Sequence, residues 1–521
     1  MKRTTHHCIF SLEEILSIIF CYCSLSTDPT ESTAPDNNTL ASLARTCRSF
    51  YEPAMDVLYS NVDMACLVQH MFEDLWYEDN MVLYFLRPME LRDWDEFFRY
   101  SRRVRILTTL SSFGINQNIY QALSHPPSHR INIFPRLNGL RLSNVIEYEF
   151  MSLLIKRNLT SILLSFGEGD EIATNILPSL PSTCPYLRRI KISPRLSGED
   201  SIGTICEVLC NLPRLETLLF SGTVLPEKVL PHLACLPSLK ELDITLPANS
   251  LDIIESDHNT FPALRELHLS SDKPEPCLQL LESVTSSCFE VIHLDASSMF
   301  SVEISQKIII LLSSFKNLSH ITILERPSVA QSVDHGVFIN ILNPLLQLHN
   351  LQHLRLCSGS TYSVDDEVLN KMASAWPRLE FLDLWPPKRG KNVPRITLPG
   401  IIPLLRCCPK LYFFGSIIDA TLPIADLSAY DTCNSSISLD VGASPISDPA
   451  AVAAFLSFVM PNIQSLSMLN PPSMHSILRE HKPKWKRVKE IIGIDADALR
   501  PIANPLILAL ERNGHRWTTL D

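Results

Sequence analysis

A nine-residue pattern recurs along the chain and limits its fold more than any other feature. Its clearest copy is Leu236-Pro-Ser-Leu239-Lys-Glu-Leu242-Asp-Ile244, in which an apolar residue or a proline precedes L-x-x-L-x-L. In a short strand, Leu242 and Ile244 point to one face and Asp243 to the other. One copy cannot bury its own apolar face, so the copies must stack. Further copies are Phe134–Leu142, Cys184–Ile192, Leu212–Phe220, Phe261–Leu269, Phe315–Ile323, Leu348–Leu356 and Trp376–Leu384.

The spacing of the copies predicts the architecture. A degenerate copy at Asn434–Leu439 divides the widest gap, and helix-like stretches such as Pro226–Leu236 and Asp365–Trp376 separate the strands. Spacings in the twenties are typical of leucine-rich repeats. We therefore predict an α/β leucine-rich-repeat solenoid over residues 101–480, with about 12–13 irregular repeats. Its parallel sheet would line the inside of a horseshoe and its helices the outside. The first leucine, or its Phe or Ile equivalent, lies at positions 137, 159, 187, 215, 239, 264, 289, 318, 351, 379, 411 and 463.

Residues 10–60 have a different pattern. Leu12–Tyr22 shows helical spacing of apolar residues, Ser24–Thr39 is polar and reads as a loop, and Leu40–Phe50 is helical again. Pro53 permits the start of a third helix. Three short helices are too small to be comfortably stable alone, so periodicity by itself fits an N-terminal cap on the repeats.

Several segments of these helices also carry a family resemblance. They are Leu12-Glu-Glu-Ile-Leu16, Ile19-Phe20, Leu43-Ala-Arg-Thr-Cys47-Arg-Ser-Phe50, Glu52-Pro-Ala54 and Val57-Leu58-Tyr59. In this order they resemble an F-box, a small all-α domain, as found in large fungal (basidiomycete-type) families of F-box proteins with leucine-rich repeats. Phe10-Ser11 stands where those families have a Leu-Pro pair.

The resemblance implies a function. An F-box docks a Skp-type adaptor and through it a cullin–RING ubiquitin ligase, while the repeats hold a substrate protein. The chain would then be a non-catalytic substrate-recognition subunit. The alternative is a repeat scaffold with no ligase role, whose first helices are only a cap. The adaptor-binding residues implied by the resemblance are Leu12, Ile15, Leu16, Ile19, Phe20, Leu43, Arg45, Cys47, Phe50, Pro53 and Leu58.

The remaining segments are expected to connect or close the array. Residues 61–100 are rich in aromatics and predict a helical connector, with Arg102–Ile106 as a first, imperfect strand. Residues 481–521 predict a C-terminal cap, in which Leu499–Arg512 covers the last repeat. The basic run Lys482–Lys489 fits a solvated surface segment, or else a nuclear-localisation or acidic-partner patch.

Composition and motifs exclude several classes. A net charge of −11 argues against a general nucleic-acid binder. The sequence has no Walker-type loop, H-E-x-x-H helix, G-x-S-x-G elbow or C-x-x-C pair, so we predict no catalytic residue, metal or cofactor. The 15 cysteines are odd in number and lie largely in apolar segments, which favours reduced thiols in the cytoplasm and/or nucleus.

Two further expectations concern membranes and secretion. Glu13 and Glu14 interrupt what would be the apolar core of a signal peptide, which argues against a secreted repeat protein. No other run of 18 uncharged apolar residues suggests a membrane span.

The late repeats predict a binding site on the concave face. Three positions of each copy project there: the residues before and after the second leucine, and the residue after the third. Aromatic, Arg and His side chains, which dominate binding hot spots, gather at these positions in adjacent late copies. A loop such as Lys388–Ile396 would be the alternative cover for these rings. The predicted substrate-binding residues are His320, His353, Arg355, Phe381, Trp385 and Phe413.

Overall fold

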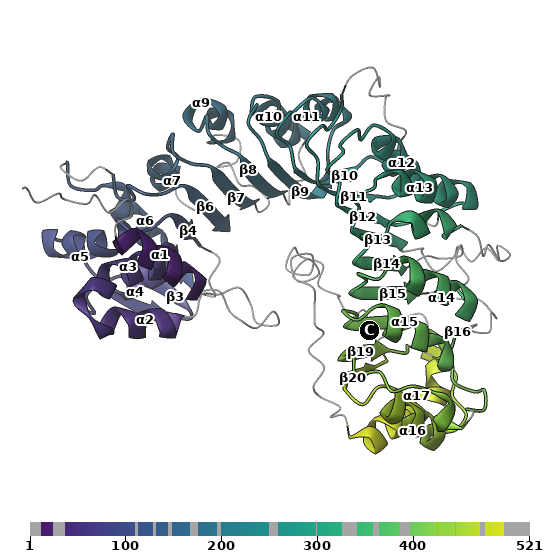
Figure 1. The fold of residues 1–521 in the computed structure, drawn as a ribbon. Coiled ribbons are helices and arrows are strands. Elements are labelled where there is room, and N and C mark those ends of the chain that lie inside the picture. Colours follow the sequence, from purple (N-terminus) through teal and green to yellow (C-terminus); the bar gives the residue numbers. More distant parts are fainter. Residues whose placement is uncertain are drawn as a thin grey trace, which may run out of the picture. The chain divides into compact units, whose positions relative to one another are not determined.

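A computed structural model describes most of the chain. The described residues are 12–23, 37–109, 113–128, 132–143, 148–166, 176–194, 199–249, 259–298, 300–325, 341–357, 364–385, 396–424, 426–442, 444–468 and 475–493. They belong to two compact units, residues 1–223 and residues 224–501. Both are mixed α/β, with a parallel sheet and many helices, which confirms the predicted fold class at this level (Figure 1).

Three helices open the first unit, as the sequence predicts: α1 (Leu12–Cys23), α2 (Asn37–Thr46) and α3 (Arg48–Leu58). Two boundaries differ from the prediction. Cys47 is in extended backbone, with φ −156° and ψ 162°, and breaks the predicted helix Leu40–Phe50 in two. The third helix therefore begins before Pro53, which lies inside α3 and removes one helix hydrogen bond there.

The prediction of a wholly helical connector over residues 61–100 is wrong. This segment contains two helices but also a hairpin, whose strands are joined by Asn80 and Met81 at φ 50° and 63°. Two positive φ values match the twist of a two-residue hairpin turn, and the alternation of Val82–Phe85 is that of a strand. The elements are β1 (Asn61–Asp63), α4 (Met64–Gln69), β2 (Trp76–Asp79), β3 (Val82–Phe85) and α5 (Leu91–Ser101).

The parallel sheet of the first unit begins earlier than predicted. Its strand order is β1-β4-β6-β7-β8-β9, so Asn61–Asp63, and not Arg102–Ile106, is its first strand. The strands are β4 (Ile106–Thr108), β6 (Gly139–Ser143), β7 (Ser161–Phe166), β8 (Arg189–Pro194) and β9 (Thr217–Val224). β5 (Gly114–Ile115) pairs with β3, and the helical elements are α6 (Gln117–Ser124), α7 (Tyr148–Leu154), η2 (Leu177–Ser179), α9 (Leu180–Thr183) and α10 (Glu199–Cys210).

The second unit continues the same strand–helix alternation. Its sheet runs β10-β11-β12-β13-β14-β15-β17-β19-β20. The strands are β10 (Glu241–Leu246), β11 (Glu266–Ser271), β12 (Val291–Ala296), β13 (His320–Glu325), β14 (His353–Cys357), β15 (Phe381–Trp385), β17 (Phe413–Ser416), β19 (Ile437–Asp440) and β20 (Ile463–Ser467). β16 (Ile396–Thr397) and β18 (Ile418–Asp419) form a separate small sheet.

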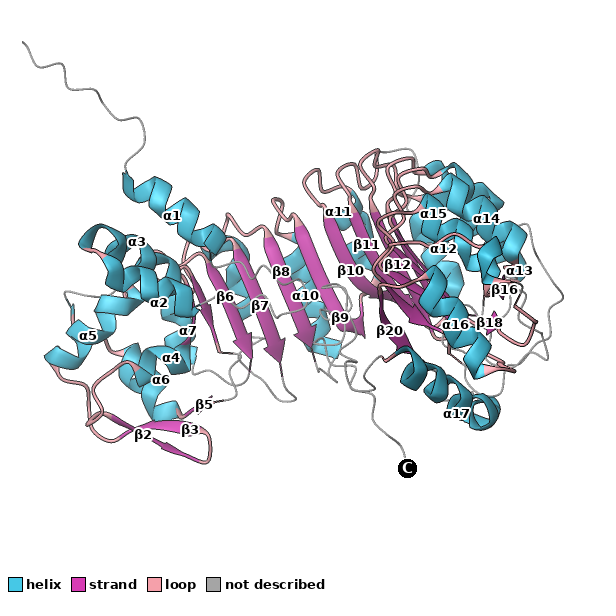
Figure 2. Ribbon diagram, turned by 60° about the horizontal axis from the view of Figure 1, so that its bottom comes forward, coloured by secondary structure: helices cyan, strands magenta, loops and turns pink. Residues whose placement is uncertain are grey.

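Helices and 3-10 turns lie between these strands. They are η3 (Glu227–Val229), α11 (Leu230–Ala234), α12 (Pro274–Glu282), α13 (Val302–Ser314), η4 (Asn343–Gln347), α14 (Asp366–Ala375), η5 (Pro399–Ile401), α15 (Ile402–Cys407), η6 (Leu427–Ala429), α16 (Pro449–Val459) and α17 (His475–Ile492). In each unit the helices of the repeats cover one face of the sheet (Figure 2). The other face, predicted to be the concave one, is here called the open face.

The repeat pattern positions the core as predicted. In the copy at β10, Leu239, Leu242 and Ile244 are fully buried, while Glu241 and Asp243 are half-buried on the open face. The same alternation recurs in β12 and β13. Even the degenerate copy forms a strand, β19, with Ile437 and Leu439 buried. Each L-x-x-L-x-L copy therefore contributes one strand and a layer of core.

The basic run near the C-terminus is part of a packed helix. It lies within α17, whose Trp485 and Val488 are buried. The indole Nε1 of Trp485 donates a hydrogen bond to the carbonyl of Ser444 at 2.8 Å. A wholly solvated segment is therefore wrong, because only one side of the run, with Lys482 and Lys486, is exposed. The predicted helix Leu499–Arg512 lies outside the described residues.

Candidate functional site

The open-face columns predicted from the repeat are aligned across neighbouring strands. In the second unit, His320 on β13 is in register with His353 on β14, and His353 with Phe381 on β15. Phe381 is in register with Phe413 on β17. Parallel strands in register place such residues side by side at about 4.8 Å. Four of the six predicted substrate-binding residues therefore form one continuous row.

The four rings of this row stack on one another, and we call them the ring column. The centroids of His320 and His353 are 5.7 Å apart, with ring planes 17° from parallel. His353 and Phe381 are separated by 4.2 Å and Phe381 and Phe413 by 4.5 Å, both pairs at 8°. These separations nearly equal the strand spacing, so the sheet itself sets the stack.

Stacking reduces the solvent exposure of the inner rings of the column. His353 and Phe381 are only 6% and 4% exposed, which differs from the expectation that these rings are free for recognition. The reason is that each inner ring is covered on both faces by its neighbours. Only the outer members, His320 and Phe413, are half-exposed. The column is therefore mainly a packing element with two accessible ends.

Burial also sets the charge of the column. Burial, with smaller effects of the nearby His320 and Arg355, lowers the pKa of His353 to about 3. The pKa of His320 is lowered as well, chiefly by desolvation. Both imidazoles are therefore uncharged at neutral pH, which suits a stack of aromatic rings.

A second row of polar residues runs beside the ring column. The Nε of Arg355 lies 3.0 Å from a carboxylate oxygen of Asp383 on the next strand, and Asp383 is nearly buried. The predicted binding residue Arg355 is thus held in an ion pair within the sheet, with 30% of its side chain exposed. In the same row, His268 and His293 stack with centroids 5.5 Å apart.

Some residues near the ring column were not singled out from the sequence. Asp383 pairs with Arg355 beside the column, and the ring of Tyr412 lies 6.0 Å from that of Phe381. The sequence pattern could have pointed to Asp383, because it occupies the same repeat position as Arg355. Tyr412 directly follows the first leucine of its copy, a position that the repeat pattern does not constrain. Trp385 lies at the end of β15, but its side chain, like most of the loop Lys388–Ile396, is outside the described residues.

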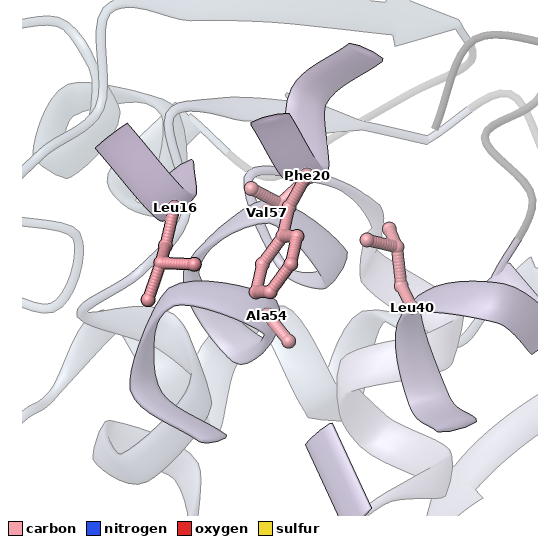
Figure 3. Close-up of a cluster of buried hydrophobic side chains, with 5 residues drawn as sticks. All are labelled: Leu16, Phe20, Leu40, Ala54 and Val57. Carbon is pink, nitrogen blue, oxygen red and sulfur yellow. The ribbon is translucent and has the colours of Figure 1, made fainter. Parts of the chain in front are cut away.

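The N-terminal helices form a small closed core. Leu16 and Phe20 of α1, Leu40 of α2, and Ala54 and Val57 of α3 point toward one another (Figure 3). Around this core pack four partly buried side chains, those of Leu43, Ala44, Phe50 and Leu58. Pro53 is also buried.

The predicted adaptor-binding residues thus divide into two sets. One set is buried or packs against the core: Leu16, Phe20, Leu43, Phe50 and Leu58 belong to the three-helix cluster, and Pro53 is buried in α3. The other set faces solvent and consists of Ile15, Ile19, Arg45 and Cys47. The side chain of Leu12 lies outside the described residues. Ile18, which the sequence did not single out, is 58% exposed next to Ile15 at 41% and Ile19 at 48%. Spacing of i, i+3 and i+4 places all three isoleucines on one side of α1.

Ion pairs fasten α3 to the repeats within the first unit. Arg103, which is nearly buried, pairs with both Glu52 and Asp56 of α3. Arg136 reaches the same Asp56 at 2.9 Å. Burial lowers the pKa of the Arg103 guanidinium, but the two carboxylates outweigh it and leave that pKa raised.

The described residues contain no cluster of His, Cys, Asp and Glu that could hold a metal ion. Within the same part of the chain, no helix is long and apolar enough to cross a membrane. The cysteines that lie in it are free thiols.

Comparisons with known proteins give low similarity. A scan against models of protein families finds no match, and neither does a search of curated proteins. A crystal structure of an internalin (inlF) from Listeria monocytogenes aligns over 65% of this chain and 83% of its own, with 14% identity and a TM-score of 0.34. The crystal structure of a TLR13–ssRNA13 complex aligns over 71% of this chain and 62% of its own, with 12% identity and a TM-score of 0.30.

Proposed function

We propose that this chain is the substrate-recognition subunit of an SCF-type (Skp adaptor–cullin–F-box) E3 ubiquitin ligase. Its N-terminal helices dock the adaptor, and the open face of its repeats holds the substrate protein. The observation that carries this proposal is the row of exposed isoleucines on α1, Ile15, Ile18 and Ile19, beside a core that is already closed.

The argument starts from the two faces of α1. One face, with Leu16 and Phe20, fills the three-helix core. A helix that only capped the repeats would place polar residues on its other face, but three isoleucines lie there instead. Contiguous exposed apolar side chains mark an interaction site. In the F-box resemblance, this segment is the one that contacts the adaptor.

The chain itself would perform no chemistry. Its contribution would be proximity, since it raises the effective concentration of substrate lysines near a charged conjugating enzyme. Cytoplasmic and/or nuclear localisation belongs to the same proposal, because the ligase machinery works there.

Point substitutions in the full-length chain test the adaptor site. We expect Ile15→Glu with Ile19→Glu to reduce co-purification of a co-expressed Skp-type adaptor at least tenfold, because two charges would enter an apolar contact. The matched control is Ile310→Glu on α13, which is an isoleucine of similar exposure on a repeat helix. Adaptor binding should survive that change.

Deletion of residues 1–60 is a weaker test. It would also remove Glu52 and Asp56 and leave the buried Arg103 without its two carboxylates. Loss of binding after such a deletion would therefore not distinguish a missing interface from a damaged repeat.

The point substitutions give the decisive outcome. Normal adaptor binding by the Ile15→Glu/Ile19→Glu variant would show that the ligase proposal is wrong at this site.

The second candidate is a partner-binding scaffold with no ligase role. The ion pairs of Arg103 and Arg136 to α3 favour it, because they make the helices a firmly attached cap. A folded wild-type chain that fails to bind any Skp-type adaptor would select this function instead.

The substrate site is tested through the ends of the ring column. Phe381 is buried and Arg355 is paired with Asp383, so alanine at either position would also disturb the sheet. His320→Ala with Phe413→Ala changes the accessible rings with less disruption. We expect the partners labelled by a proximity-biotinylation fusion to change for this variant while adaptor binding is retained. An unchanged partner profile would move the substrate site elsewhere.

A further inference from the structure

The hairpin of β2 and β3 has a free edge. In its sheet the strand order is β2-β3-β5, so β3 is paired on both sides, and no strand in the described part of the chain pairs with the other side of β2. The hairpin lies at the margin of the first unit (Figure 2). Tyr77, Glu78 and Asp79 of β2 are exposed. The free edge of β2 is therefore accessible to a partner.

A hydrogen bond on the far side of β3 shows which backbone groups of β2 point to this edge. The carbonyl of Leu83 accepts a hydrogen bond from the backbone N–H of Asn116 at 2.9 Å, so Leu83 directs its backbone polar groups away from β2. Opposite residues of an antiparallel pair behave alike. Glu78, the register partner of Leu83, therefore directs its N–H and C=O toward the free edge. The alternation has a period of two, so Trp76 does the same, and no described residue pairs with these groups.

Two tyrosine rings lie on one face of the hairpin. Tyr77 and Tyr84 are register partners, and their ring centroids are 5.0 Å apart with planes 19° from parallel. Tyr77 is 42% exposed, and Met81 in the turn is 46% exposed. An extended peptide added to β2 would place a side chain beside Tyr77, as neighbouring strands do. The stacked tyrosines therefore offer an apolar contact next to the free edge.

The free edge is also acidic. Between residues 71 and 90, Arg87 is the only Lys or Arg, and its guanidinium is held by Asp93 at 2.6 Å. Glu78 and Asp79 are exposed and form no ion pair within the described residues. Two copies of this chain joined edge to edge would bring these carboxylates together, and like charges on neighbouring strands are destabilising. A partner segment with Lys or Arg would be attracted instead.

We propose that the free edge of β2 binds an extended segment of a partner protein in which Lys or Arg residues stand beside apolar ones. The segment adds a strand to the hairpin, and its backbone pairs with Trp76 and Glu78. Its apolar side chain lies against Tyr77, while its cations face the two carboxylates. In complexes of this kind the main-chain hydrogen bonds supply affinity and the side chains supply specificity. The surface lies outside the open face of the repeats and does not depend on the ligase role.

The test uses the full-length protein and a fluorescein-labelled octapeptide of alternating lysine and valine, in an anisotropy titration at low salt. We expect Glu78→Lys with Asp79→Lys to weaken binding about tenfold, because attractive charge pairs become repulsive. The matched control is Glu282→Lys with Glu303→Lys, which makes the same change in net charge at exposed residues of α12 and α13. The control should bind as the wild type does.

Two further measurements separate strand addition from charge attraction alone. The first uses the same octapeptide N-methylated at its central residues, which keeps its charge but cannot pair with the edge. Wild-type binding of this peptide should be about tenfold weaker. The second compares Glu78→Pro with Glu78→Gln. Both remove the charge, but proline also removes the N–H that faces the edge, so it should weaken binding more while the circular dichroism of both variants stays unchanged.

The opposite results would overturn the proposal. They are no octapeptide binding by the wild type, an equal loss in both lysine double variants, equal binding of the N-methylated peptide, or equal effects of Glu78→Pro and Glu78→Gln. A wild-type dimer in sedimentation that Glu78→Pro dissociates would also overturn it, because a second copy would then occupy the edge. Adaptor co-purification is measured in parallel. If the octapeptide binds at β2 but the adaptor does not bind, the ligase function fails and this surface stands.

Discussion

The imidazole of His353 lies flat against the ring of Phe381, with centroids 4.2 Å apart and planes 8° from parallel. The two residues occupy the same position in successive repeats, and their strands are in register. Each therefore covers the other, and both are buried although they belong to the face of the sheet that carries no helices. The contact makes the middle of the ring column a source of stability in the late repeats.

Replacing Phe381 tests this role. We expect Phe381→Ala to cost about 3 kcal/mol, because it leaves a cavity between two rings. Hydrogen exchange at β14 and β15 should then accelerate by about a hundredfold where exchange follows local opening. Phe413→Ala, at the half-exposed end of the column, should have a smaller effect. Equal effects of the two changes would argue against a buried stack.

The buried His353 should make stability depend on pH. Its pKa is about 3 in the folded chain and 6.5 without burial, so between these values the unfolded chain binds the extra proton. The contribution of His353 to the free energy of unfolding is therefore at its full value well above pH 6.5 and falls as the pH drops toward 3. Between pH 7.5 and 5.5 the loss should be about 1.4 kcal/mol.

Urea denaturation at both pH values measures this loss. His353→Phe keeps an aromatic ring in the stack and should reduce the pH-dependent loss by about that amount. The exposed His349 provides the control substitution, His349→Phe. His268, whose pKa burial lowers to about 4, should contribute a loss of its own in both proteins. An identical pH response in wild type and His353→Phe would contradict the assignment.

The pairs of Arg103 should matter more than ordinary surface ion pairs. Glu52→Gln together with Asp56→Asn leaves a nearly buried cation without its carboxylates, which costs about 3 kcal/mol. Adding Arg103→Met should recover much of that loss, since an apolar side chain needs no partner. Thermal unfolding of the three variants measures both steps. A triple variant no more stable than the double would show that the charge of Arg103 was not the cause.

The packing of α17 should protect the basic run from proteolysis. Trp485→Ala removes a buried indole and its hydrogen bond to the carbonyl of Ser444, at a cost of about 3–5 kcal/mol. We expect trypsin to cut faster after Lys486 and Arg487 in this variant. Ile491→Ala, at an exposed position of the same helix, is the control and should leave the cleavage rate unchanged.

Much of the repeat region could be predicted from local pattern alone. The L-x-x-L-x-L copies place their strands correctly, including the degenerate copy at β19. Their spacing also predicts that His320, His353 and Phe381 share one row. This works because a period of two in apolar residues is a local signal that each strand carries itself.

Other features could not be predicted in this way. The sequence does not distinguish the hairpin of Trp76–Asp79 and Val82–Phe85 from a helix, because its aromatic content suits either structure and its turn depends on backbone angles at Asn80 and Met81. The burial of His353 was also missed, because its cover comes from strands distant in sequence.

The sequence by itself thus determined the repeating unit, the direction in which each side chain leaves its strand, and the rows that those side chains form. Only the tertiary structure decided which members of a row remain accessible. Phe381 and Phe413 have the same pattern position and the same ring, yet one is buried and the other half-exposed. The physical reason is that solvent exposure depends on the neighbours on both sides, and a repeat pattern specifies a residue's direction but not what stacks against it.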